Sequence, residues 1–569
     1  MQWQNAYSFP ANRHRSKLSI VIWMAMIVAI FLTIAFFLVG TEYRGDQYYT
    51  ESDLTFLRFS KTHDIFSLLV TNYSPVAQYS IPYGGWPPLR TLLQAIWLPL
   101  HISLPGARLL TCILVILTFG FFVVMLARRI SPQADLPLVL SMALLSPIGI
   151  THIGLGVSSI LIPLAAVIPL MLLAWNRKLH SFLILLVGFV LGLSDWNAYA
   201  IIPSLFIVVL IRKISSSNDL DYRFLFKFAV FLSIGFIIAF LSYKLILLYE
   251  IKRSAYNTVF IYPGMTVSTL QFRVLPPVNI YLAAGFLSFM RLLLTSLPII
   301  ILLAILYFSK NGKLSEISLS SNNGIILSLA FLSPLVYCLV FPGHVGIVAH
   351  HAQMLPFLAP VTLLTAFIEI KTAHCNFFRF IFTMILISFS LFCLYSQKFL
   401  PDKFLRYASH HGLVSPLPPG NYDLTSKPEK LSLESVIRGG IVKQFNYPPL
   451  LDEKMVRINA FNHTMYNFAS CGHEIKKNTS EDEIIIVFGD APYSSMFYTK
   501  RVVLGISNFA ELFELLKTLR GKFDKLKVAI LVPSDYNIDL LDKSKIDDYK
   551  IKLIKIISGT PYKLIYLST

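Results

Sequence analysis

Apolar runs of about twenty residues recur along this 569-residue chain and constrain its fold more than any other feature. One such run is long enough to cross the hydrocarbon core of a bilayer, about 30 Å thick, as a single helix. Charged residues make up only 14% of the chain, whereas soluble domains hold about 25%. The sequence therefore predicts a polytopic α-helical membrane protein rather than a soluble globular one.

The apolar runs define eleven candidate spans, and the basic residues between them predict their orientation. Membrane proteins gather Lys and Arg in cytoplasmic loops. With the N-terminus inside, every predicted inside loop carries basic residues, whereas the short outside loops 151–156, 195–197 and 342–353 carry none. We therefore predict an N-in, C-out topology, and the net charge of +18 does not indicate a nucleic-acid partner. The predicted spans are 18–40, 107–127, 134–150, 157–175, 180–194, 198–212, 227–249, 283–307, 324–341, 354–370 and 378–396.

The same topology divides the chain into three parts. Residues 1–396 form a transmembrane module with a long first extracytoplasmic loop, 41–106, that is too polar and too long for a simple connector. Residues 397–480 are polar and Pro-rich and read as an irregular extracytoplasmic linker. In 481–569, short apolar runs typical of strands flank a helical pattern, which predicts a small extracytoplasmic α/β domain.

The first loop opens with an acidic and aromatic cluster that is the strongest candidate for chemistry. Asp46 follows the first span by about six residues, and Arg44, Tyr48, Glu51 and Asp53 stand close to it. A partly desolvated carboxylate at the membrane surface can act as a general base or bind a cation. The plain alternative is an ordinary solvated loop acid. We take Asp46 as the candidate catalytic residue and the other four as candidate binding residues.

Two segments later in this loop have apolar residues at helical spacing, Ser52–Lys61 and Pro88–Leu100. Each is typical of an amphipathic helix lying in the membrane interface, with Trp86 and Trp97 suited to headgroup depth. Core helices beneath an outer domain are the alternative. Arg90 lies in the second segment and is a candidate for binding donor or acceptor.

Further candidates stand at the predicted outer ends of other spans. Asp195 is an ionisable residue near the membrane, which is either functional or, with Ser194, a helix cap. Adjacent His residues project in different directions and no third ligand is visible, so a phosphate or hydroxyl contact is favoured over a metal site. Basic side chains there suit an anionic headgroup or snorkel to the interface. The remaining candidates are Lys244, Arg253, Arg273, Arg291, His344, His350 and His351.

Three short motifs and the layout of the chain resemble the GT-C superfamily of integral-membrane glycosyltransferases. GDQYYTESD (45–53) stands where that family has its first-loop acidic motif. GGWPPL (84–89) resembles its H-P-P-L element, with Trp86 where His is common, and HHAQMLPFLAP (350–360) resembles its late His/Arg–Pro motif. Within the superfamily the chain looks most like bacterial protein O-mannosyltransferases and lipid A aminoarabinose transferases. It departs from many relatives at Gln47, where a second acid is common.

The resemblance implies transfer of a sugar from a polyprenyl-phosphate-linked donor to a hydroxyl of a glycan, lipid or protein acceptor. The reaction would take place on the extracytoplasmic face, with Asp46 as the base, in a bacterial inner membrane. Basic side chains can neutralise the leaving phosphate, so no metal is required, although a divalent cation stays open as a cofactor. The absence of a second acid beside Asp46 argues against a metal-dependent mechanism.

Two other classes of protein stay open on the sequence. An O-antigen ligase or polysaccharide polymerase also has a long outside loop and basic residues. A lipid or sugar transporter or flippase would place ionisable residues at the midplane and show two related halves. Here the acids cluster at one predicted face and no half-to-half symmetry is visible, which favours a transferase.

Overall fold

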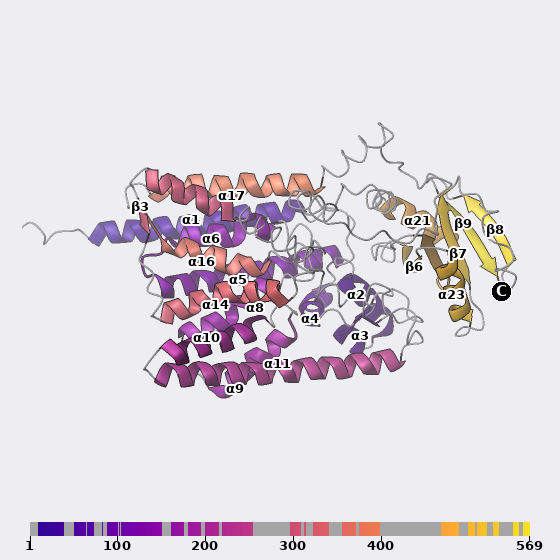
Figure 1. Ribbon diagram of the computed structural model, residues 1–569. Helices are drawn as coiled ribbons and strands as arrows, with labels where there is room; N and C mark the ends of the chain where they lie inside the picture. Colours follow the sequence, from indigo (N-terminus) through magenta and orange to yellow (C-terminus); the bar gives the residue numbers. More distant parts are fainter. Residues whose placement is uncertain are drawn as a thin grey trace, which may run out of the picture.

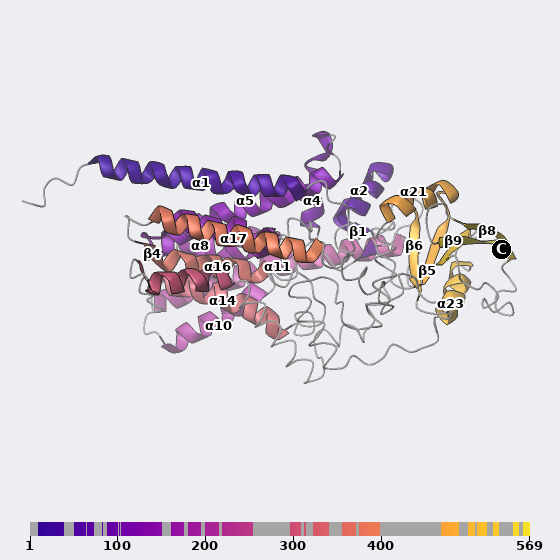
Figure 2. The same ribbon diagram turned by 90° about the horizontal axis from the view of Figure 1, so that it is seen from above.

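The structure is a computed structural model of the full chain, in which a bundle of roughly parallel helices carries a small β-sheet at one end (Figure 1). It is mostly helical, and Figure 2 shows the same bundle from above. The residues described are 10–38, 51–63, 65–72, 82–83, 88–100, 102, 104–150, 161–175, 180–194, 200–215, 219–253, 296–308, 312–314, 322–340, 355–370, 375–398, 468–488, 499–506, 509–520, 527–533, 550–556 and 562–568.

Each predicted span contains an apolar helix among these residues. By length and composition, four described helices can cross a membrane: Lys17–Phe36, Leu109–Ile130, Tyr222–Glu250 and Cys375–Phe392. Shorter apolar helices account for the other predicted spans. The chain is therefore a polytopic membrane protein, as the apolar runs predict. The bundle helices are α1 (Pro10–Leu38), α5 (Leu104–Ile130), α6 (Leu136–Leu145), α8 (Ile162–Trp175), α9 (Ser181–Gly192), α10 (Ile201–Ser215), α11 (Asp219–Arg253), α14 (Asn322–Val340), α16 (Leu358–Leu364), α17 (Cys375–Lys398) and the helix Ser296–Phe308.

Helix α6 is the centre of the bundle. Every residue from Pro137 to Leu145 is buried, and α1, α5, α16 and α17 all pack against it. A helix that is apolar all round belongs in such a core. Its start is fixed by Asp135, whose carboxylate accepts a hydrogen bond from the backbone N–H of Leu138 at 3.3 Å. Outer helices instead leave large apolar side chains exposed, such as Phe36 and Phe121, as expected where lipid is the solvent.

Helices α9 and α11 approach each other so closely that their backbones touch at glycines. A Cβ atom added at Gly188 would lie 2.2 Å from the carbonyl oxygen of Leu232, and one at Gly235 would lie 2.0 Å from that of Leu185. Small residues allow this approach between membrane helices, where dispersion and close packing replace the hydrophobic effect. The pair forms a rigid support for the elements at its ends.

The first-loop elements lie together at one end of the bundle (Figures 1 and 2). They are α2 (Glu51–Thr62), α3 (Phe66–Leu69), β1 (Thr71–Asn72), β2 (Pro82–Tyr83), α4 (Leu89–Ala95) and the 3-10 turn Leu98–Leu100. Both predicted helices form, but the second ends early, at Ala95. The Trp97 indole donates to Thr111 Oγ1 on α5 at 2.9 Å, so it is engaged with the bundle beneath it.

At the opposite end, two short strands close the bundle (Figures 1 and 2). Strand β3 (Gly312–Leu314) pairs antiparallel with β4 (Ile368–Ile370). The predicted span 354–370 is therefore not a single helix: it consists of short helical pieces, among them α16, and ends in β4. The main-chain groups of its last residues pair with another segment instead of continuing the helix.

The C-terminal residues form a five-stranded sheet in the order β6-β5-β7-β9-β8. Strands β6 and β7 run parallel to β5, while β9 is antiparallel to both β7 and β8. The sheet lies at the same end of the bundle as α2–α4 (Figure 1). The elements are α21 (Phe468–Asn478), β5 (Ile484–Phe488), β6 (Val502–Ile506), α23 (Phe509–Arg520), β7 (Val528–Pro533), β8 (Lys550–Ile556) and β9 (Tyr562–Ser568).

Helix α21 lies inside the segment predicted as an irregular linker. The contact that satisfies its last carbonyl groups comes from Arg501, which lies later in the chain, so the sequence of the segment alone does not show it. The Arg501 guanidinium, at the start of β6, donates to the carbonyl oxygens of Lys476 and Thr479 at 3.2 and 2.7 Å. These carbonyls end α21 and have no acceptor role within the helix. Residues 399–467 of that segment lie outside the described residues.

Candidate functional site

Buried polar side chains gather on α2 and α4, the two main helices of the first loop. On α2 they are Thr55 and Arg58, and on α4 they are Arg90, Thr91 and Gln94. Arg58 is 8% exposed and Arg90 is 7% exposed. The two helices contact each other, and both contact α5 below them. The first loop therefore folds into a compact platform with polar groups inside it.

Two buried guanidinium groups in one small platform are an uncommon arrangement. Arg is almost never fully buried unless it is paired, because desolvating a charge costs several kcal/mol. It also keeps its charge in proteins and cannot escape that cost by losing a proton. Its planar fork matches a phosphate or carboxylate with two parallel hydrogen bonds. Arg58 and Arg90 thus give this platform the chemistry to hold an anion.

The platform is tied to the bundle through the end of α9. The backbone N–H of Leu89, next to Arg90, donates to the carbonyl oxygen of Leu193 at 3.0 Å. The Ser194 hydroxyl donates back to the carbonyl oxygen of Leu191 at 2.7 Å. Ser194 therefore contributes to the end of α9. Asp195, the other candidate cap of the following helix, lies outside the described residues, so the capping interpretation stays a prediction.

Helix α11 extends beyond the bundle and contacts α3 and β2 from the side (Figure 1). Near this end Tyr243 is 2% exposed and Glu250 is 4% exposed. The Lys244 ammonium lies 5.5 Å from the centre of the Phe240 ring, one turn earlier on the same helix. This contact places Lys244 against its own helix, as a cation–π pair.

Among the candidates from the sequence, the side chains of Arg90 and Lys244 are described. For Glu51, Asp53 and Arg253 the structure describes only the backbone, which places the first two on α2 and the third at the end of α11. Within the described part of the chain, no group of three or more His, Cys, Asp and Glu residues could hold a metal ion. The candidates outside the described residues are Arg44, Asp46, Tyr48, Asp195, Arg273, Arg291, His344, His350 and His351.

Sequence reasoning missed Arg58, Gln94 and Glu250 as members of this end of the molecule. Arg58 stands three residues after Thr55, and Gln94 four residues after Arg90, so each pair shares one helix face. This spacing of two polar residues on one helix face could have indicated a shared polar site. Which face is buried depends on how the helices pack, and the spacing alone does not give that.

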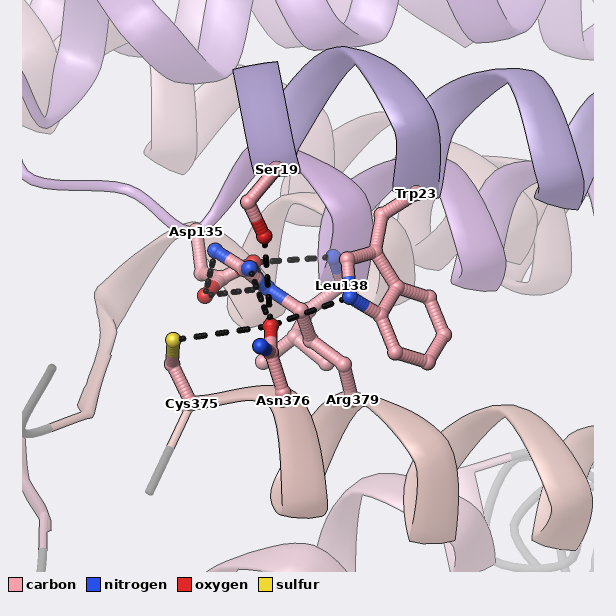
Figure 3. Close-up of polar contacts among 7 residues, drawn as sticks. All are labelled: Ser19, Trp23, Asp135, Leu138, Cys375, Asn376 and Arg379. Atoms are coloured by element: carbon pink, nitrogen blue, oxygen red, sulfur yellow. Dashed lines mark hydrogen bonds and ion pairs between the residues drawn. The ribbon is translucent and has the colours of Figure 1, made fainter. Parts of the chain in front are cut away.

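A second polar cluster lies at the other end of the bundle, close to β4, and Figure 3 shows it in detail. Arg379 on α17 forms an ion pair with Asp135 at the start of α6, with Nη2–Oδ2 at 2.9 Å and Nε–Oδ1 at 3.0 Å. Both side chains are at least nine-tenths buried. This is the bidentate geometry that makes Arg–carboxylate pairs strong and directional.

Asn376 extends this cluster to the first helix (Figure 3). Its Oδ1 atom accepts hydrogen bonds from Arg379 Nη1 at 3.2 Å and from the Trp23 indole at 3.0 Å. Ser19 Oγ lies 3.4 Å from the same oxygen. The cluster therefore joins three helices, α1, α6 and α17. Its charges are matched one to one, which is typical of a structural element.

Comparisons with known proteins identify the fold. No protein-family model matches the sequence, and no curated protein is significantly similar to it. Solved structures do match, and they show the fold of this chain. One of them is ArnT, a lipid A aminoarabinose transferase, from Cupriavidus metallidurans.

That structure, ArnT bound to undecaprenyl phosphate, aligns with a TM-score of 0.55 at 10% sequence identity. The alignment covers 96% of this chain and 98% of ArnT. ArnT in the apo state aligns with a TM-score of 0.49 at 9% identity. The likeness to lipid A aminoarabinose transferases, first seen in three short motifs and the layout of the chain, holds for the fold through the first of these structures.

Proposed function

We propose that this protein is an integral-membrane glycosyltransferase that moves a sugar from a polyprenyl-phosphate carrier to an acceptor hydroxyl. The observation that carries the proposal is the fold shared with ArnT over nearly the full length of both chains. The ArnT structure holds undecaprenyl phosphate. A carrier of that chemistry keeps its lipid tail in the bilayer, so its sugar-phosphate must react at a membrane surface.

The reacting surface in this proposal is the end of the bundle that bears α2–α4. The basic-residue pattern predicts that this end is extracytoplasmic. Buried Arg58 and Arg90 lie there, and the C-terminal sheet lies at the same end (Figure 1). Two guanidinium groups suit the phosphate of the donor. The bilayer delivers the lipid-linked donor to the edge of this platform.

The proposed chemistry is a single displacement at the anomeric carbon. Asp46 takes the proton of the acceptor hydroxyl, and the acceptor oxygen forms the new bond to the anomeric carbon. The bond between that carbon and the phosphate oxygen breaks, and the electron pair leaves with the polyprenyl phosphate. The leaving group gains negative charge, which Arg58 and Arg90 stabilise. One displacement inverts the configuration of the sugar carbon.

The proposal is tested by transfer from a radiolabelled polyprenyl-phosphate sugar in membranes that contain the full chain. We expect Asp46→Asn to lower the rate about 10²- to 10⁴-fold, the usual contribution of a general base. Asp482→Asn is the matched control, since its carboxylate pairs with Lys527 on the surface of the C-terminal sheet. Undiminished transfer by Asp46→Asn would reject the base. Failure of the wild type with every such donor would favour the ligase, polymerase or transporter alternatives.

A further inference from the structure

Helix α1 precedes the first-loop elements in the sequence, and helix α17 precedes the C-terminal sheet; both of these parts lie at the platform end of the bundle. Helix α1 ends at Leu38, ahead of the first-loop elements, and α17 ends at Lys398, ahead of the C-terminal sheet. Both lie along the outer part of the bundle (Figures 1 and 2). A shift of one of these helices against the other therefore moves the point from which one of the two parts continues.

Helix α1 is peripheral, and only one stripe of it, with Ile27, Phe31 and Ala35, is buried in the core. Only 17% of its membrane-crossing window is buried, compared with 61% for the window in α5. Its packing contacts are mainly with α6. Because lipid is as apolar as the helix surface, burial alone does little to fix a peripheral helix, and interhelical hydrogen bonds gain importance.

Helix α17, in contrast, is fixed along its length on α6 by polar groups. Beyond the Arg379–Asp135 pair, the Thr383 and Ser141 hydroxyls lie 3.2 Å apart. Further on, the Ser390 hydroxyl donates to the carbonyl oxygen of Leu145 at 2.7 Å. These buried contacts prevent α17 from sliding or rotating on α6 without breaking hydrogen bonds in a dry environment.

We propose that Asn376 is a positioning residue that fixes the rotation and register of α1 against α17. Its Oδ1 atom accepts from Trp23 on α1 and from Arg379 on α17, so one atom links the peripheral helix to the fixed one (Figure 3). A slip of one residue along α1 would move its far end by about 1.5 Å and turn it by about 100°. That displacement would pass to the chain that follows Leu38. Only the effect on transfer rests on the proposed function, whereas the effect on helix position does not.

The first experiment measures the distance between α1 and α17 and does not depend on transfer activity. Genetically encoded spin labels replace the exposed side chains of Phe36 on α1 and Leu391 on α17 in the full chain in lipid nanodiscs, and pulsed resonance gives their distance distribution. We expect Asn376→Leu to shift or broaden the distribution and Asn376→Asp, which keeps the acceptor oxygen, to restore it. Thr33→Val is the control on the same helix, because its hydroxyl bonds to Ala29 of α1 itself. An unchanged distribution in Asn376→Leu overturns the proposal.

The second experiment measures transfer. We expect kcat to fall about fivefold in Asn376→Leu, the effect of losing about one hydrogen bond, with little change in the donor KM and recovery in Asn376→Asp. If Asn376→Leu does not fold, Trp23→Phe removes only the α1 donor and should shift both readouts in the same direction. A shifted distance with unchanged kcat supports the position of α1 set by Asn376 and overturns its effect on transfer. A wild type without transfer activity rejects the proposed function and leaves the distance test standing.

Discussion

At the β3–β4 end of the bundle Arg379 is matched by one carboxylate, whereas at the α2–α4 end two arginines, Arg58 and Arg90, are buried on two helices that contact each other. The first end forms a bidentate ion pair that joins α6 to α17. At the second end, the described buried side chains include Arg58, Arg90 and a single acid, Glu250. The elements there are held by main-chain hydrogen bonds, such as Leu89 to Leu193. The matched pair at the first end joins two helices, whereas the two guanidinium groups at the second end have the planar fork that binds a phosphate.

The largest effect is expected at the matched end. Arg379→Leu leaves the Asp135 carboxylate buried without its partner, and we expect a loss of about 3–5 kcal/mol in the free energy of unfolding. The double variant Arg379→Leu/Asp135→Leu should recover most of that loss, since apolar residues can replace a buried pair at little cost. Unfolding in detergent measures both variants. A double variant as unstable as the single one would show that the pair does more than cancel charge.

A smaller effect is expected where close packing supports the platform end. Gly188→Ala drives a Cβ atom into the Leu232 carbonyl on α11, and two helix backbones cannot both yield, so we expect a loss of about 2–3 kcal/mol. Gly120→Ala is the control, because its Cβ would meet the flexible tip of Leu144 at 2.9 Å. The comparison of the two unfolding curves is the measurement. Equal losses in both variants would mean that the α9–α11 contact has no special rigidity.

The smallest effect is expected in the C-terminal sheet. The Tyr566 hydroxyl donates to the main-chain carbonyl of Asn478, and Tyr566→Phe should lower stability by about 1 kcal/mol at neutral pH. Burial, with the Glu483 carboxylate as a lesser cause, raises the pKa of Tyr566 from 10.0 to about 12.

The raised pKa of Tyr566 determines how the stability of the protein changes at alkaline pH. A raised pKa means that the folded state holds the proton more tightly, so this stability is present below pH 10 and is lost as the pH rises from 10 to about 12. Unfolding curves at pH 9 and pH 11 should therefore differ more for the wild type than for Tyr566→Phe. An equal decrease in both proteins would contradict the assignment.

The sequence predicted the elements that depend on local pattern. Long apolar runs gave helices because their length and composition suit a bilayer, and 3.6-residue spacing gave the helices near Arg58 and Arg90. The fold shared with ArnT agrees with the layout that the resemblance implied. These features are encoded within a few turns of chain.

What the sequence did not predict depends on distant partners. Asp135 and Arg379 are 244 residues apart, and each alone looks like an ordinary charge at a span edge. Strand β6 was missed because Gly505 interrupts its apolar run, and its pairing with β5 is seen only in the folded sheet. The role of Asp46 stays a prediction, because that residue lies outside the described part of the chain.

Helix α11 has a mechanical consequence that follows from its length. Its 35 residues span about 52 Å, while a hydrocarbon core is about 30 Å thick. The excess forms an arm that reaches α3 and β2. A helix adapts to a thinner or thicker bilayer by changing its tilt, and the tip of a long arm moves furthest. The thickness of the surrounding lipid thus acts directly on the platform that the arm touches.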